Sequence, residues 1–248
     1  MSESVPFGKV VQMRILIAIP VHNEARTVQD VLTEVRSFHT DVLVIDDGSS
    51  DGTAELIQQV PGVWVLSHPV NQGYGASLIG AFAWADERGY DWVITMDCDR
   101  QHEPHRIPDF LDAIASDKWD LISGSRYLVP ELADGMPPAD RRSINATLTC
   151  IINDIFATNL TDAFCGFKAH RVKPAIKLAL TEKGYAFPMQ LWPRAIGAGL
   201  RITEIPVRLI YNDPNRHFGG GLDDPSDRLY HYLEVLTLET KLVKEPNQ

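Results

Sequence analysis

Two carboxylates at alternating positions, Asp97 and Asp99, follow directly after an apolar run at residues 92–96. A buried strand over that run would bring both acids to the same edge of a sheet. Hard divalent cations prefer oxygen ligands, and water and substrate phosphates often complete their coordination shell. The pair therefore predicts a Mg²⁺ or Mn²⁺ site, with Gln101 as a further ligand or as a residue that orients one. The competing interpretation is that these acids are solvated or cap the helix that follows.

A second acidic pair, Asp46 and Asp47, follows the apolar residues 42–45. Adjacent acids at the end of a strand repel each other unless a base, a ribose or a cation uses them. We therefore expect both side chains to contact a ligand. Asp51 and Thr53, a few residues further on, instead suit a turn and the cap of a helix.

Two further polar segments stand where a strand gives way to a helix. Asn23 and Glu24 offer an amide and a carboxylate, although Asn23 also suits the N-cap of the first helix. Asn71 and Gly73 belong to a glycine-bearing loop, which would let the backbone approach a nucleotide or a phosphate. By itself the loop carries little information.

The elements that would position these residues alternate in the first 125 residues, where short β-branched runs are separated by amphipathic stretches of helical length. Such alternation is typical of βαβ units and a parallel sheet. Ligands of open α/β sheets collect beyond the carboxyl ends of the strands, so the polar clusters should meet at one edge. The predicted strands are residues 14–20, 41–46, 63–67, 91–97 and 120–124, and the predicted helices are residues 25–38, 53–60, 75–88 and 107–116.

The second half of the chain has a different pattern. An apolar stripe at helical spacing predicts a helix that packs on the core; its residues are Ile144, Leu148, Ile151, Ile152, Ile155 and Phe156. Residues 201–211 predict a strand. Residues 212–225, with three consecutive glycines, predict a mobile loop, and residues 226–243 predict a closing helix.

Composition excludes several classes of function. With 33 acidic and 23 basic residues, a net charge of -10 and no basic tract, the chain is not expected to bind nucleic acid. Three separated cysteines without a CxxC motif fit a reducing cytoplasm. We expect no signal peptide and no spanning helix, so any membrane contact would be peripheral, at the cytoplasmic face.

Taken together and in order, four motifs resemble the family 2 glycosyltransferases, which have the GT-A fold. They are Pro20-x-x-Asn23-Glu24, Asp46-Asp47-Gly48-Ser49-x-Asp51-Gly52-Thr53, Asn71-x-Gly73-x-Gly75-Ala76 and Asp97-x-Asp99-x-Gln101-His102. Three later segments are similar to the branch that transfers sugars to dolichyl or polyprenyl phosphate, namely residues 124–126, 162–168 and 204–207.

The resemblance implies one GT-A catalytic domain over residues 1–248, an α/β fold with a mainly parallel central sheet flanked by helices. Residues 14–125 would bind the nucleotide-sugar, residues 126–211 would form the acceptor side, and residues 212–248 would hold the mobile loop and the last helix. The implied activity is metal-dependent, inverting transfer of a sugar from a UDP- or GDP-sugar to a polyprenyl or dolichyl phosphate, with Mg²⁺ or Mn²⁺ as cofactor.

The same resemblance assigns roles to individual residues. The nucleoside pocket would be lined by Pro20, Asn23, Glu24 and Asp47, and the metal that bridges the diphosphate would be held by Asp97, Asp99 and Gln101. The phosphate of the acceptor would be bound by Arg126 and Arg141, each of which also suits a surface ion pair. Arg216 would close over the donor phosphates.

Two departures from the family pattern stand out. Residues 216–221 read Arg-His-Phe-Gly-Gly-Gly where family members carry Gly-x-Ser-Lys, and Cys98 replaces a common alanine. An acceptor hydroxyl, unlike a phosphate, would need a general base, for which Asp162 is the candidate.

Three alternatives remain open from the sequence: a glycosyltransferase with a soluble acceptor, a non-catalytic nucleotide-sugar-binding module and a nucleotidyltransferase. A nucleotidyltransferase usually has a Gly-rich loop with Arg and Lys after the first strand, where this chain has residues 21–24, Val-His-Asn-Glu. No G-x-G-x-x-G follows that strand either, which disfavours a dinucleotide-binding oxidoreductase.

Overall fold

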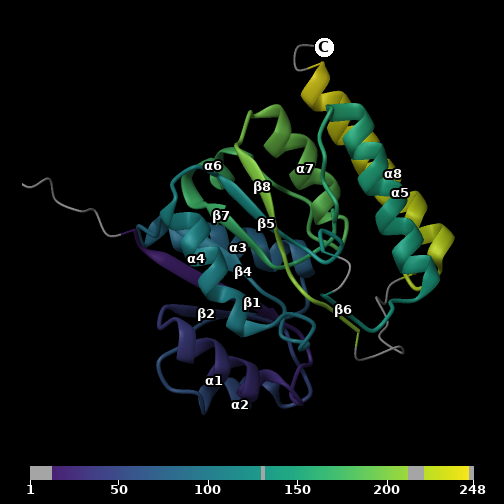
Figure 1. Cartoon of the computed structure of the whole chain (residues 1–248). Helices are drawn as coiled ribbons and strands as arrows, with labels where there is room; N and C mark the ends of the chain where they lie inside the picture. Colours follow the sequence, from purple (N-terminus) through teal and green to yellow (C-terminus); the bar gives the residue numbers. More distant parts are fainter. Residues whose placement is uncertain (1–12, 130–131, 212–220, 246–248) are drawn as a thin grey trace, which may run out of the picture.

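A seven-stranded sheet forms the centre of the computed structural model, which describes residues 13–129, 132–211 and 221–245 (Figure 1). The strand order is β3-β2-β1-β4-β7-β5-β8. All neighbouring pairs are parallel except those of β7, which runs antiparallel to β4 and β5. The strands are β1 (Ile15–Val21), β2 (Val42–Asp47), β3 (Trp64–His68), β4 (Trp92–Thr95), β5 (Leu121–Ser125), β7 (Lys168–Arg171) and β8 (Ile202–Pro206).

Helices cover both faces of this sheet (Figure 1). The short turn η1 (Pro104–Arg106) precedes α4. The helices are α1 (Val28–Phe38), α2 (Thr53–Gln58), α3 (Tyr74–Glu87), α4 (Ile107–Ala115), α5 (Ala139–Phe156), α6 (Val172–Lys177), α7 (Phe187–Gly197) and α8 (Pro225–Lys244).

Alternation along the strands divides the core into two apolar layers. In β1, Ile17 and Ile19 belong to the layer under α1 and α4, whereas Leu16 and Ala18 belong to the layer under α3 and α5–α8. The two layers form because successive side chains of a strand point to opposite faces. Each fully buried aliphatic side chain contributes about 1.5–3 kcal/mol, so burial on both faces makes this sheet a rigid support for its loops.

The expected α/β architecture is confirmed in the first half, where the predicted strands and helices occur with small shifts of their ends. The largest shift is at the first helix, which begins at Val28 rather than at residue 25. The apolar stripe of the second half is also core, as predicted. Ile144, Leu148 and Ile152 are buried, and α5 packs against α7 and the long helix α8 (Figure 1).

Several elements of the second half were not predicted. β7, α6 and α7 had no counterpart among the expected elements. The predicted strand at residues 201–211 is two strands, because β8 ends at Pro206 and the chain then leaves the main sheet. The second piece, β9 (Leu209–Ile210), pairs instead with β6 (Ala133–Asp134). Of the predicted mobile loop, residues 212–220 lie outside the described part of the chain.

Within the described ranges, no helix combines the length and the apolarity needed to cross a membrane.

Candidate active site

One large cavity, of about 1330 Å³, opens at the carboxyl ends of β1, β2 and β4. It collects most of the residues that the sequence singled out, from loops far apart in the chain. Those lining it are Pro20, Asn23, Glu24, Asp47, Asn71, Gly73, Asp97, Asp99, Gln101, Arg126 and Arg141. Asp46 and Asp162 do not line it, and Arg216 lies outside the described residues.

Asp97 follows the end of β4 and lies close to His102 and Gly166. The backbone N–H of Asp97 donates to Nδ1 of His102 over 3.0 Å. A Cβ on Gly166 would lie 2.6 Å from Oδ2 of Asp97, so a larger residue there would force the carboxylate to shift. Burial, and then the negative charge of Asp97, raise the pKa of the Tyr74 phenol well above its ordinary value.

This carboxylate fits a divalent cation. Oδ1 of Asp97 is buried with no hydrogen-bond donor among the described residues, and such an orphaned oxygen is costly unless a ligand uses it. Asp99 also lines the cavity, and its Oδ1 accepts the backbone N–H of Gln101 over 2.9 Å. No cluster of three or more His, Cys, Asp or Glu suited to a metal occurs in the described ranges. The protein thus offers part of a coordination shell, as Mg²⁺ sites with substrate phosphates do.

The two acids at the end of β2 differ in position, because Asp47 lines the cavity and Asp46 does not. Asp47 accepts hydrogen bonds from Nδ1 of His68 and from the backbone N–H groups of Gln72 and Gly73, at 2.7 to 2.8 Å. It thereby shapes the glycine-bearing loop at the wall of the cavity. Asp46 is buried and accepts the N–H of Ser49 over 3.1 Å, so the structure does not bring it to the site. The pleat separates the pair, because adjacent strand residues face opposite sides.

Asn23 and the turn after β2 hold each other in place. Asn23 has a left-handed backbone with φ of 58°, donates its N–H to Oγ of Ser49 and accepts the N–H of Ser50. The suggestion that Asn23 is the N-cap of the first helix was wrong, because Thr27 occupies that position. Asp51 takes the predicted turn role, accepting N–H groups from Ala25 and Thr53.

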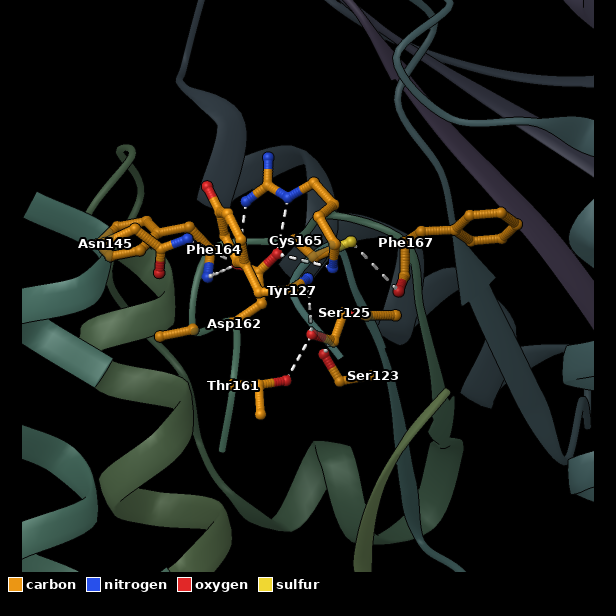
Figure 2. A network of polar contacts seen from close by, with 12 residues as sticks. Ser123, Ser125, Tyr127, Asn145, Thr161, Asp162, Phe164, Cys165 and Phe167 are labelled. Carbon is orange, nitrogen blue, oxygen red and sulfur yellow. Dashed lines mark hydrogen bonds and ion pairs between the residues drawn. The ribbon is translucent and has the colours of Figure 1, made fainter. Parts of the chain in front are cut away.

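A buried ion pair joins Arg126, which lines the cavity, to Asp162, which does not. Oδ2 of Asp162 lies 2.6 Å from Nε of Arg126, and Oδ1 lies 2.9 Å from Nη2. Nδ2 of Asn145, on α5, donates to the same Oδ1 over 2.9 Å (Figure 2). Burial alone would raise the pKa of Asp162, but the Arg126 guanidinium and these hydrogen bonds lower it to about 2. Such a carboxylate is a poor proton acceptor, and Asp162 does not line the cavity, so the structure disfavours the general-base role suggested for it.

Some residues of the cavity were missed by sequence reasoning. Arg228, from α8, also lines it, donates from Nη1 to the carbonyl of Leu222 and pairs through Nη2 with Asp140. Its only sequence signal was an arginine in a helix, which usually means a solvated face. Tyr74 lies inside the glycine-loop motif, so the signal for it was position alone.

A mainly parallel sheet, with acidic residues delivered to one cavity by β2 and β4, is the architecture of the GT-A fold. The chain belongs to glycosyl transferase family 2, whose model matches residues 16–178.

Two relatives extend the similarity beyond that segment. The chain is 35% identical over 207 residues to an undecaprenyl-phosphate mannosyltransferase of Micrococcus luteus, with 80% of this chain and 84% of that protein covered. It is 31% identical over 204 residues to a polyprenol monophosphomannose synthase of Mycolicibacterium smegmatis, with 78% and 76% covered.

Solved structures agree on the fold. Glucosyl-3-phosphoglycerate synthase from Mycobacterium tuberculosis, in complex with Mn²⁺, uridine-diphosphate and phosphoglyceric acid, superposes with a TM-score of 0.71. The alignment covers 92% of this chain and 78% of that chain at 17% identity, so it speaks for the fold alone.

Proposed function

We propose that the protein transfers a sugar from a nucleoside-diphosphate donor to a polyprenyl phosphate, with inversion at the anomeric carbon. The carrying observation is that one cavity holds both Asp97 and Asp99, on the donor side, and Arg126 and Arg141, on the acceptor side. The names of the relatives from Micrococcus luteus and Mycolicibacterium smegmatis support a lipid-phosphate acceptor.

The donor would bind along the ends of β1, β2 and β4. Pro20, Asn23, Glu24 and Asp47 would line the nucleoside end, while the loop with Asn71 and Gly73 lies next to Asp47. Asp97 and Asp99, with Gln101 beside them, would hold a Mg²⁺ or Mn²⁺ ion, which stabilises the negative charge of the departing diphosphate. We also assign Arg216 to the donor phosphates.

Transfer would be one direct displacement. The bond between the anomeric carbon and the diphosphate oxygen breaks as a bond forms to an oxygen of the acceptor phosphate. Since a phosphate monoester is already anionic at neutral pH, no general base is required. The chain's task is then to align the two phosphates, which agrees with the arginines at the acceptor side.

The proposed acceptor also indicates where in the cell the protein would act. A polyprenyl phosphate is held in a membrane, so a protein of this composition would meet it peripherally, from the cytoplasmic face. The net charge of -10 opposes attraction to an anionic bilayer, so recognition would depend on the phosphate and its chain.

A soluble acceptor is the second candidate. The structural neighbour from Mycobacterium tuberculosis was solved with phosphoglyceric acid, which also carries a phosphate that arginines can bind. A non-catalytic nucleotide-sugar-binding module would keep the donor site and turn nothing over.

One assay separates these functions. Purified protein is supplied with Mg²⁺ or Mn²⁺ and a panel of UDP- and GDP-sugars, with either polyprenyl phosphate in detergent or 3-phosphoglycerate. Free nucleoside diphosphate and labelled acceptor are then measured. Metal-dependent labelling of the lipid supports the proposal, and labelling of the soluble acceptor alone replaces it. Donor binding without any transfer would instead support the non-catalytic nucleotide-sugar-binding module.

A further inference from the structure

The acceptor side of the cavity rests on one buried carboxylate that no ligand needs to touch. Asp162 is fully buried and accepts five hydrogen bonds, three at Oδ1 and two at Oδ2. The donors come from Arg126, Asn145 and Phe164. Figure 2 shows Asn145 and Phe164 beside the carboxylate. A carboxylate has about four lone-pair sites, so its accepting capacity is filled by the protein itself.

These bonds orient the Arg126 guanidinium. Its Nε and Nη2 both donate to Asp162, in the two-pronged geometry that fixes the plane of an arginine. Nη1 makes no hydrogen bond within the described residues, and Arg126 lines the cavity. Nη1, on the edge of the guanidinium that does not contact Asp162, can therefore donate to an anion bound in the cavity.

The same carboxylate reaches the helix that carries the second arginine. Asn145 lies one turn after Arg141 on α5, and residues four apart share a helix face. Both line the cavity, and Asn145 donates from Nδ2 to Asp162 while Arg126 binds it from the end of β5. Asp162 thus contacts Arg126 directly and, through Asn145, contacts the helix that carries Arg141.

A second layer holds Asp162 in turn. Glu204, on β8, accepts the N–H of Asp162 through Oε1, and the N–H and the hydroxyl of Thr161 through Oε2, at 2.8 to 3.1 Å. The Thr161 hydroxyl also bonds that of Ser125, the residue before Arg126 (Figure 2). Neither Glu204 nor Thr161 lines the cavity, so their contribution is indirect.

We propose that Asp162 is a positioning residue, which holds Arg126 and helix α5 so that Arg126 and Arg141 bind the acceptor phosphate together. The inference rests on the proposed function, since it presumes a phosphate acceptor. A buried ion pair contributes little net stability compared with apolar packing, which is consistent with a positional task here.

The test compares Asp162→Asn with a matched control, Glu239→Gln. Glu239 is buried, pairs with Arg194 through Nε and Nη2 as Asp162 pairs with Arg126, and lies away from the cavity. Steady-state transfer is measured for both variants with polyprenyl phosphate and with the nucleotide-sugar varied separately. For Asp162→Asn we expect the acceptor KM to rise about ten-fold or more, with the donor KM unchanged within about two-fold. Glu239→Gln should leave both constants unchanged.

A third variant covers the case in which Asp162→Asn does not fold. Glu204→Gln keeps the shape of the second layer and should raise the acceptor KM in the same direction by a smaller factor, about two- to five-fold. A folded Asp162→Asn or Glu204→Gln with the wild-type acceptor KM overturns the inference, as does an equal rise of the donor KM or the same effect in Glu239→Gln. Wild-type protein that labels no polyprenyl phosphate overturns the proposed acceptor and this inference together.

Discussion

Gly166 lies so close to Asp97 that a methyl group on its Cα would sit 2.6 Å from one carboxylate oxygen and 2.9 Å from the other. The loop that leads into β7 therefore forms a wall of the predicted metal site. This contact joins two segments that are distant in sequence, and it explains why the small residue of the Cys165-Gly166-Phe167 motif is needed at that position.

Replacing Gly166 by alanine should displace the Asp97 carboxylate and reduce sugar transfer by about 10²-fold, because the new Cβ cannot fit beside it. Initial rates at saturating donor and metal would measure the loss. Gly80→Ala is the control: Gly80 lies inside α3, where its Cβ would meet a flexible leucine side chain at 3.3 Å and Nε2 of His68 at 3.9 Å, an ordinary van der Waals contact. Wild-type transfer by Gly166→Ala would contradict the close approach.

Substituting Asp99 by alanine should abolish transfer, with a loss of about 10²-fold or more even at saturating Mg²⁺ or Mn²⁺. The reason is that one of the two carboxylates of the proposed metal site disappears. Labelled lipid formed per minute is the readout, and Asp46→Asn, outside the cavity, should keep most of its activity. Near-wild-type turnover by Asp99→Ala would remove this residue from the proposed metal site.

Acid should destabilise the protein partly through Asp162. Because Arg126 and the hydrogen bonds lower the pKa of Asp162 from 3.8 to about 2, this group contributes stability above its unfolded pKa of 3.8. That contribution is lost as the pH falls towards the folded pKa. Urea unfolding measured from pH 5 to pH 2 should therefore show a weaker pH dependence in Asp162→Asn than in the wild type. Equal slopes would show that Asp162 has an ordinary pKa.

Substitutions in α5 can test whether its apolar stripe packs in the protein core or faces a membrane. Leu148 is fully buried among the apolar residues beneath α5, so Leu148→Ala should lower the free energy of unfolding by about 2–5 kcal/mol. Thr147→Ala, on the exposed side of the same helix, should change it by less than about 0.5 kcal/mol. If Leu148→Ala keeps full stability but loses binding to lipid vesicles, the stripe faces a bilayer instead.

Much of the proposed donor site could be predicted from the sequence. Apolar runs at the spacing of strands and helices placed Asp47 and Asp97 at strand ends, and the carboxyl ends of parallel strands meet at one edge whatever the loops between them. Local pattern and this topological rule were therefore sufficient to bring Asn23, Asn71 and Asp99 to the same cavity.

The second half of the chain was less predictable, because its local signals are weak. β7 is only four residues long and includes the buried polar residues Lys168 and His170, so no alternation of apolar and polar residues marks it. It is stabilised by pairing with β4 and β5 on either side, which a local pattern does not report.

From its sequence alone the protein was an α/β glycosyltransferase of family 2, with acids at the strand ends and arginines on the acceptor side. Only the tertiary structure decided that Asp47 lines the cavity while Asp46 does not, and that Asp162 pairs with Arg126. Periodicity tells which residues are buried, whereas the partner of a buried polar group depends on segments that only the folded chain brings together.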